Sequence, residues 1–258
     1  MGLSNNQIKS VEETIKNSLR KRFETYNPEP AVMPFHTRLL GKDRLALYSF
    51  IHSLNTNFGT TIFEPVAVAL AKDRFKKAEK QVKTPNLISE KALYEIQKIM
   101  DNLIAGFNKP DKTKEIEIIR KVCREGEMRT IKPTRVDVYL ESKDDEIYLI
   151  DIKTAKPNKG NFKEFKRTLL EWVAVTLAEN PDAKINTLIA IPYNPYEPKP
   201  YSRWTMAGML DLNKELKVAE DFWDFLGSKG AYIDLLDCFE RVGIELRDEI
   251  DNYFHRFK

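Results

Sequence analysis

Hydrophobic residues recur every three or four positions over several stretches of the chain, which is the spacing of a helix with one apolar face. The stretches predict an N-terminal helix from Ile8 to Leu19, a helix around 45–54, a helix over 93–107 and a long terminal helix from Tyr232 to Phe257. A connection that contains Pro28, Pro30 and Pro34 is expected after the first helix, and a short helix near 222–226. We therefore expect residues 1–108 to be mostly helical and residues 201–258 to form a C-terminal helical part.

A polar segment, SLNTNFGTT, separates two of these helical patterns. Gly59 and the threonines beside it favour the end of one helix and the start of the next, because glycine ends helices and threonine caps a first turn. The next helix is expected to begin at Ile62. Glu64 would then lie in its first turn.

From residue 134 the apolar period changes to two, which is the period of a half-buried strand. The alternating apolar positions are Val136, Val138 and Leu140. A second run, Ile147 to Lys153, is rich in β-branched and aromatic residues, which favour strands. The polar break at 142–146 between the two runs predicts a β-hairpin.

Beyond the hairpin the pattern predicts a helix over 162–179 and a short apolar strand over 187–191. The order of elements is thus α, β, β, α, β. This order is typical of an α/β fold with a mixed central sheet flanked by helices. We expect residues 109–200 to hold the core of that sheet.

The composition, with 42% hydrophobic and 31% charged residues, fits an ordinary globular protein. A net charge of +3 allows a polyanionic partner without requiring one. Cys123 and Cys238 lie far apart without a CxxC spacing, which argues against a disulfide framework and a structural zinc site. No apolar run reaches the length of a membrane span, and the polar N-terminal segment lacks the apolar centre of a signal peptide. We expect a cytoplasmic protein.

The candidate site residues are Asp137 on the first hairpin strand and the triplet Asp-Ile-Lys at 151–153 on the second. Residues two apart in a strand share a face, so Asp151 and Lys153 point the same way. An odd turn centred on Asp144 would place Asp137 directly opposite Asp151, with Cβ atoms about 4.5–5.5 Å apart. An even turn would put the two aspartates on opposite faces. The odd turn predicts two carboxylates within reach of one divalent ion.

Two carboxylates beside a lysine suit the metal-dependent hydrolysis of phosphodiesters. Carboxylates hold Mg²⁺ through few protein ligands, which leaves positions for water and for a phosphate oxygen. The ion lowers the pKa of a bound water, and a lysine can orient or help deprotonate that water. The pattern Asp, a gap and Asp-x-Lys is the PD-(D/E)xK nuclease signature, with Val136 in place of the leading proline.

The alternative is a solvated strand face on which the same three residues form cross-strand ion pairs. Asp-x-Lys is common by chance, so the triplet alone favours that alternative. The hairpin, the helices before it and the basic loop and helix after it match the α-β-β-β-α-β core of the nuclease superfamily. This order of elements favours the nuclease site.

Longer segments of the chain resemble the TdeIII family of type II restriction endonucleases. The segments are HSLNTNFGTTIFEPVA at 52–67, RVDVYL, DIKTAKPNKG and LLEWVA. The resemblance implies a single restriction-endonuclease-like domain over 1–258. It also implies cleavage of double-stranded DNA at a short interrupted palindrome of the GGNCC kind, leaving 5′-phosphate ends.

The resemblance also assigns roles to residues. Asp137, Asp151 and Lys153 would be catalytic, together with Glu64 as an additional helical acid, and the metal ion would be bound by Asp137, Asp151 and Glu64. The cofactor would be Mg²⁺, with Mn²⁺ as a substitute. For Glu64 the alternative is an exposed first-turn glutamate stabilised by the helix dipole.

Candidates for DNA contacts come from the basic segment after the second strand and from the loop PYNPYEPKPYSRW. The candidates are Lys156, Asn158, Lys159, Lys163, Asn194, Tyr196 and Arg203. Lys166 and Arg167 extend the basic segment. The alternatives are a solubilising patch for the basic residues and a packed connection for the loop.

A two-fold symmetric DNA target predicts a homodimer with the same symmetry. The apolar stripe from Tyr232 to Phe257 is the candidate interface, and its alternative is packing within its own subunit. A cognate DNA methyltransferase is expected in the same system, without physical contact. Two other functions stay open: a structure-specific repair or junction nuclease of this fold, and a catalytically silent DNA-binding protein.

Overall fold

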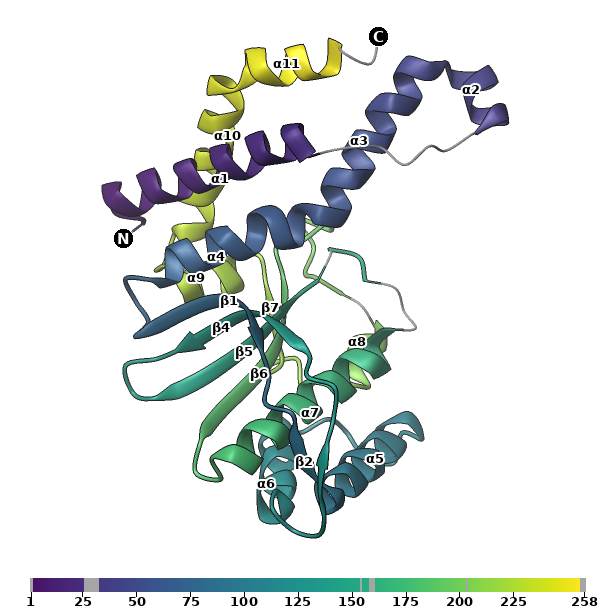
Figure 1. The fold of residues 1–258 in the computed structure, drawn as a ribbon, viewed down its shortest axis with the longest axis vertical. Coiled ribbons are helices and arrows are strands. Elements are labelled where there is room, and N and C mark those ends of the chain that lie inside the picture. Colours follow the sequence, from purple (N-terminus) through teal and green to yellow (C-terminus); the bar gives the residue numbers. More distant parts are fainter. Residues whose placement is uncertain (1, 26–32, 154, 158–160, 203, 256–258) are drawn as a thin grey trace.

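A mixed five-stranded sheet lies at the centre of the protein (Figure 1). The computed structural model describes residues 2–25, 33–153, 155–157, 161–202 and 204–255. In spatial order the strands are β1 (Lys77–Lys83), β4 (Arg135–Glu141), β5 (Glu146–Ile152), β6 (Lys184–Ile191) and β7 (Leu216–Val218). Strands β1, β4 and β5 pair antiparallel, and β6 and β7 continue the sheet in parallel with β5. The expected α/β fold with a mixed sheet flanked by helices is confirmed.

The β4–β5 hairpin has the predicted register. Val138 pairs with Ile150 and Glu141 with Ile147, so the turn has an odd number of residues centred on Asp144. Extended by one residue, this register puts position 137 opposite position 151. The condition for bringing the two aspartates together is therefore met.

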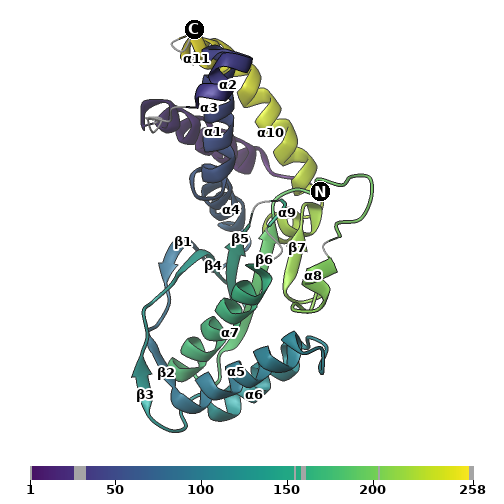
Figure 2. The same ribbon diagram turned by 90° about the vertical axis from the view of Figure 1, so that its right-hand side faces the viewer.

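Three helices cover one face of the sheet (Figure 2). They are α5 (Glu90–Ile104), α6 (Lys112–Val122) and α7 (Phe162–Glu179). Helix α7 has the predicted bounds and connects β5 to its parallel neighbour β6, as a parallel pair requires. A two-stranded sheet of β2 (Leu87–Ser89) and β3 (Met128–Thr130) adjoins this layer. Ser89 caps α5, because its Oγ accepts the N–H of Ala92 at 3.0 Å.

The remaining helices lie on or beyond the opposite face of the sheet. They are α1 (Asn5–Thr25), α2 (Pro34–Leu40), α3 (Lys42–Phe58), α4 (Glu64–Ala71), α9 (Glu220–Leu226), α10 (Ala231–Glu245) and α11 (Arg247–His255). The short helix α8 (Trp204–Ala207) is the exception: it lies beside α7 (Figure 1), and its Met206 packs into the core of the first face. Helices α1, α4, α9 and α10 form a second hydrophobic core with residues of β4, β5 and β6. Among the described residues, no helix is both long and apolar enough to cross a membrane. The sheet thus separates two cores, one on each face.

The predicted helix break at Gly59 is wrong. Helix α3 continues through a π-helical turn, η1 (Gly59–Phe63), directly into α4, and Gly59 keeps helical dihedral angles with φ −52°. The reason is tertiary packing: Ile62, Val66 and Leu70 are buried in the core, which outweighs the low helix propensity of glycine. The first residue of α4 is Glu64, so its predicted place in a first turn is confirmed.

Pro34 was expected within a connection and is instead the first residue of α2. Proline fits that position because the first helical N–H has no partner in any case. Pro28 and Pro30, the other prolines expected in this connection, lie outside the described residues.

The predicted continuous helix from Tyr232 is also wrong, because α10 ends before Leu246 and α11 begins after it. Leu246 is buried, and the break lets it and Tyr253 both face the core. The Tyr253 ring stacks on Phe23 of α1 with ring centroids 4.5 Å apart. The apolar stripe of this segment is therefore largely buried within its own chain, and Phe257 lies outside the described residues.

A cluster of buried charges joins α6, α7 and the loop before β7. Lys166 Nζ lies 2.5 Å from Glu115 Oε2 and 2.6 Å from Glu215 Oε2. Lys112 Nζ lies 3.0 Å from Glu215 Oε1 and donates to Thr187 Oγ1 at 2.5 Å. The two lysines and two glutamates balance in formal charge, which permits their burial.

Candidate active site

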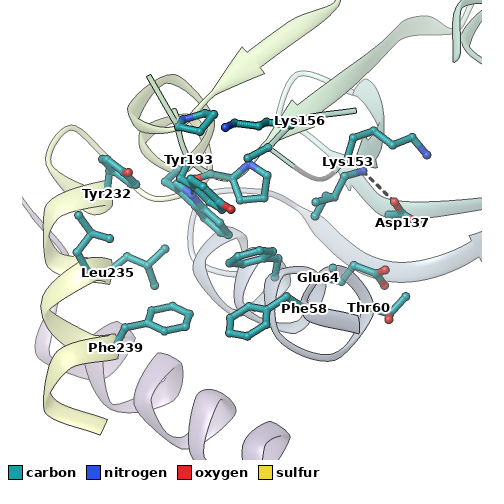
Figure 3. A pocket seen from close by; sticks show the side chains of 18 residues that line it. Phe58, Thr60, Glu64, Asp137, Lys153, Lys156, Tyr193, Tyr232, Leu235 and Phe239 are labelled. Carbon is teal, nitrogen blue, oxygen red and sulfur yellow. Dashed lines mark hydrogen bonds between the residues drawn. The ribbon is translucent and has the colours of Figure 1, made fainter. Parts of the chain in front are cut away.

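Three elements bring the predicted site residues to the end of the β4–β5 hairpin. Glu64 comes from the first turn of α4, Asp137 from β4, and Asp151 and Lys153 from the end of β5. Glu64, Asp137 and Lys153 line a cavity of about 840 Å³. Figure 3 shows these three residues on one side of the cavity and aromatic side chains, among them Phe239, on the other. The fold thus gathers acids that are far apart in the sequence.

Asp151 and Lys153 point the same way, as two residues on one strand face should. Lys153 Nζ lies 2.7 Å from Asp151 Oδ1. It also lies 4.8 Å from the centre of the Phe165 ring of α7, close enough for a cation–π contact. Asp151 is buried and Lys153 is half-buried, so the ammonium group is held between a carboxylate and a ring at the cavity.

Asp137 lies just beyond the last recorded pair of the hairpin. Its Oδ2 accepts the backbone N–H of Ile152 at 2.8 Å, drawn as a dashed line in Figure 3. The side chain thus takes the hydrogen bond of a neighbouring strand residue. This contact fixes the Asp137 carboxylate next to the β5 residues that flank Asp151.

Gln81 of β1 is a site residue that the sequence did not indicate. Its Nε2 donates to Glu64 Oε1 at 3.0 Å and Oε2 at 2.9 Å, and to Asp137 Oδ1 at 3.3 Å. One amide therefore bridges two carboxylates from different elements. Its strand, KAEKQVK, lacks the alternation of apolar residues that marks a buried strand, so no sequence signal pointed to it.

Two of the acids have pKa values well above the ordinary range. Burial raises the pKa of Glu64 to about 7, the Gln81 hydrogen bond lowers it, and the nearby Asp137 raises it. Burial also raises the pKa of Asp151, against the lowering effect of Lys153, and Asp137 raises it further. Burial is thus the main cause of both shifts, and the closeness of Asp137 adds to each of them.

The donor set fits a hard divalent cation. Glu64, Asp137 and Asp151 offer oxygen ligands, and a cation would stabilise the charged forms of Glu64 and Asp151, which burial first and the nearby Asp137 second disfavour. Within the described part of the chain, no three His, Cys, Asp or Glu side chains are already close enough together to hold a metal ion. Between Glu64 and Asp137 the position is taken by the amide of Gln81.

The other half of the cavity is apolar and aromatic. It is lined by Phe58, Phe63, Trp223, Tyr232 and Phe239. Phe63 and Trp223 lie in contact, with ring centroids 6.0 Å apart. Such a wall next to buried carboxylates can exclude water and offer flat surfaces to sugars and bases.

The predicted DNA contacts lie in different surroundings. Lys156 is exposed at the cavity, with Nζ 5.6 Å from the centre of the Tyr196 ring, and Lys163 is exposed on the first turn of α7. Asn194 uses its side chain within its own loop, donating to Lys199 O at 2.7 Å and accepting the Tyr196 N–H. Contact of these residues with DNA stays a prediction.

Other members of the predicted basic segment differ. Lys166 is fully buried between two glutamates, so extending the DNA contacts to Lys166 was wrong. The helical period explains this error, because it turns Lys166 to the covered side of α7 while Lys163 stays exposed. Asn158, Lys159 and Arg203 lie outside the described residues.

In a comparison with known proteins, residues 3–243 match the family model of type II restriction endonuclease HinfI. The chain is similar to the type II restriction enzyme MjaII of Methanocaldococcus jannaschii, with 29% identity over 94% of this chain and 72% of that enzyme. The chain is also similar to two type II restriction enzymes of Herpetosiphon aurantiacus, HgiCII and HgiEI, with 24% identity to each. Both alignments cover 84% of this chain, and they cover 80% of HgiCII and 79% of HgiEI. The region matched by the family model contains every residue of the site described above.

Proposed function

Because this chain belongs to the HinfI family of type II restriction endonucleases, we propose that Asp137, Asp151 and Lys153, with Glu64, form a metal-dependent site that hydrolyses DNA. The membership itself establishes the class: a site-specific deoxyribonuclease that acts on double-stranded DNA. The observation that carries the proposal is the meeting, at the end of one hairpin, of the buried Asp151, the half-buried Asp137 and an ammonium group 2.7 Å from Asp151.

The protein's own groups have distinct tasks in this proposal. Asp137 and Asp151 would hold Mg²⁺, or Mn²⁺ as a substitute, and Glu64 lies beside them. When bound, the cation lowers the pKa of a water and offsets charge on the phosphate. Lys153 Nζ, fixed by Asp151 and Phe165, orients the attacking water or binds a phosphate oxygen. The bond from phosphorus to O3′ breaks, which leaves a 5′-phosphate and a 3′-hydroxyl.

The target and the partners follow from the family and from symmetry. The sequence resemblance favours a short interrupted palindrome of the GGNCC kind. A palindrome is cut on both strands by a protein of the same symmetry, so the working unit is a homodimer. A DNA methyltransferase of the same specificity protects the host DNA, and the two enzymes need no physical contact.

Plasmid digestion with Mg²⁺ tests the proposal. The wild-type protein is expected to give discrete fragments, with ends that can be sequenced, and none when EDTA is present. Asp151→Asn and Lys153→Met should each lower cleavage by at least about a hundredfold. Both variants should still bind the target fragment in Ca²⁺, because they act on metal and water rather than on base edges.

The controls separate this reading from the other two functions. Lys143→Met, an exposed change in the hairpin turn, should cut like the wild type. Nicks placed by DNA shape instead of sequence would favour a repair or junction nuclease. Retarded but uncut DNA would favour a silent binding protein, and full cleavage by Lys153→Met would remove the assignment of the lysine.

A further inference from the structure

Gln81 has an unusual backbone for its place in the sheet. In β1 and β4, Lys80 pairs with Val138 and Val82 with Val136, so Gln81 lies opposite Asp137. Gln81 itself is not part of the pairing, and its φ is +57°, in the left-handed region that is unfavourable for a residue other than glycine. Strain of this kind is retained where the surrounding structure requires it, and often at functional sites.

The Gln81 side chain makes the contacts that this backbone permits. Three carboxylate oxygens, two from Glu64 and one from Asp137, lie 2.9–3.3 Å from its Nε2. The amide has two N–H groups, so each carboxylate receives one. Glu64 is only 1% exposed, so water offers this carboxylate little compensation if the amide is removed.

The same distances fit a second use of the amide. In an octahedral Mg²⁺ shell with ligands at 2.0–2.1 Å, neighbouring oxygens lie about 2.9–3.0 Å apart. A half-turn of the terminal amide exchanges its nitrogen and oxygen at nearly the same place. After this half-turn, the distances from Gln81 Oε1 to the oxygens of the two carboxylates would match those between neighbouring ligands of one ion.

We propose that Gln81 is a ligand of the divalent cation through Oε1, and that in the metal-free protein its N–H groups hold Glu64 and Asp137 in place. The inference rests on the proposed metal-dependent cleavage. A neutral amide suits this double task because it both donates and accepts, whereas lysine or arginine in its place could only donate. Gln81 thus adds an oxygen ligand between Glu64 and Asp137 to those that the acids offer.

Calorimetric titration with Mn²⁺, without DNA, tests the assignment. Gln81→Met keeps the side-chain length but removes the oxygen, and it should weaken Mn²⁺ binding by at least about tenfold. Gln81→Glu restores an oxygen ligand and should bind Mn²⁺ at least as tightly as the wild type. Gln97→Met, an exposed change on α5, is the matched control and should leave the affinity unchanged.

Nuclear magnetic resonance gives a readout of the amide itself. The Gln81 side-chain NH₂ signals, identified by their loss in Gln81→Met, should shift on Mg²⁺ titration and saturate with the binding isotherm. Signals that do not move, or a Gln81→Glu variant that binds Mn²⁺ more weakly than the wild type, would overturn the proposal. The signals and Gln81→Glu also decide the matter if Gln81→Met does not fold.

Asp137→Asn separates this inference from the proposed function. If Asp137→Asn loses Mn²⁺ binding while Gln81→Met keeps wild-type affinity, the metal site stands and the role of Gln81 is refuted. If Asp137→Asn binds Mn²⁺ like the wild type, the proposed metal site fails, and the role of Gln81 fails with it.

Discussion

Glu64 is a buried acid whose proton is held far more tightly in the folded chain than in the unfolded one. Its pKa rises from 4.5 to about 7, first because of burial. The folded state therefore binds this proton more tightly, and raising the pH from about 4.5 to 7 withdraws stability from the metal-free protein. A bound cation reverses this pH dependence of stability, because the cation binds the carboxylate in its charged form.

The loss of stability of the metal-free protein with rising pH can be tested by thermal unfolding in EDTA. Between pH 5.5 and pH 8 the wild type should lose roughly 1–3 kcal/mol of stability that Glu64→Gln does not lose. Addition of Mg²⁺ should raise the melting temperature more at pH 8 than at pH 5.5. Glu240→Gln, an exposed change on α10, is the control and should follow the wild type. An equal pH dependence in wild type and Glu64→Gln would contradict the prediction.

At the scale of residues, the sequence predicted what depends on strand period and missed what depends on backbone strain. Asp151 and Lys153 lie two apart on one strand, and the turn centred on Asp144 then fixes the position of Asp137. Gln81 reaches the site through a left-handed backbone on an edge strand, a conformation that glutamine does not itself indicate. Its place could therefore not be predicted from local pattern.

Among the elements, the α2–α3 pair is distinguished by several large apolar side chains that are exposed to solvent. Phe35 is 85% exposed and Leu39 is 82% exposed. Leu47, Tyr48 and Ile51 continue the exposed series along α3. Figures 1 and 2 show this arm extending away from the sheet. Because the stripe of α10 and α11 is largely buried in its own subunit, the arm is the better candidate for contact between two copies.

Introducing negative charges on the exposed apolar face of the α2–α3 arm tests that assignment, with light scattering as the measurement. The double change Phe35→Asp and Leu39→Asp should weaken the dimer by at least about tenfold, because two carboxylates would lose water on association. The variant should also nick one strand before the other. Phe107→Asp, at a position 79% exposed on the far layer, should stay dimeric. A wild-type monomer, both free and on DNA, would refute the homodimer.

Helix α7 and strand β1 show how a buried apolar face decides whether the sequence indicates an element. Helix α7 packs its apolar face on the sheet, and its predicted bounds were right. Strand β1 lies at the sheet edge with charged side chains and left no periodic signal. The apolar pattern continues unchanged across Leu246, so the sequence does not indicate the break between α10 and α11. Its position depends on packing against α1.

For the whole molecule, the buried cluster around Lys166 is the clearest test of what holds the layers together. Lys166→Met leaves Glu115 without its lysine and should cost about 3–5 kcal/mol in urea unfolding, since a buried charge loses its partner. Lys91→Met breaks an exposed pair with Glu125 and should cost at most about 1 kcal/mol. Similar losses of unfolding free energy in the two variants would mean that the buried cluster contributes no more to stability than an exposed ion pair does.

The same cluster constrains how this lineage can change. Replacing Lys112, Glu115, Lys166 or Glu215 alone strands a charge in the interior, whereas replacing a lysine and a glutamate together with apolar residues of similar volume is close to neutral. A stepwise exchange of charged residues for apolar ones therefore passes through a single-residue variant that is poorly folded. We expect relatives to keep all four residues or to have exchanged them in oppositely charged pairs, so that these positions covary in an alignment although all four are buried away from the surface.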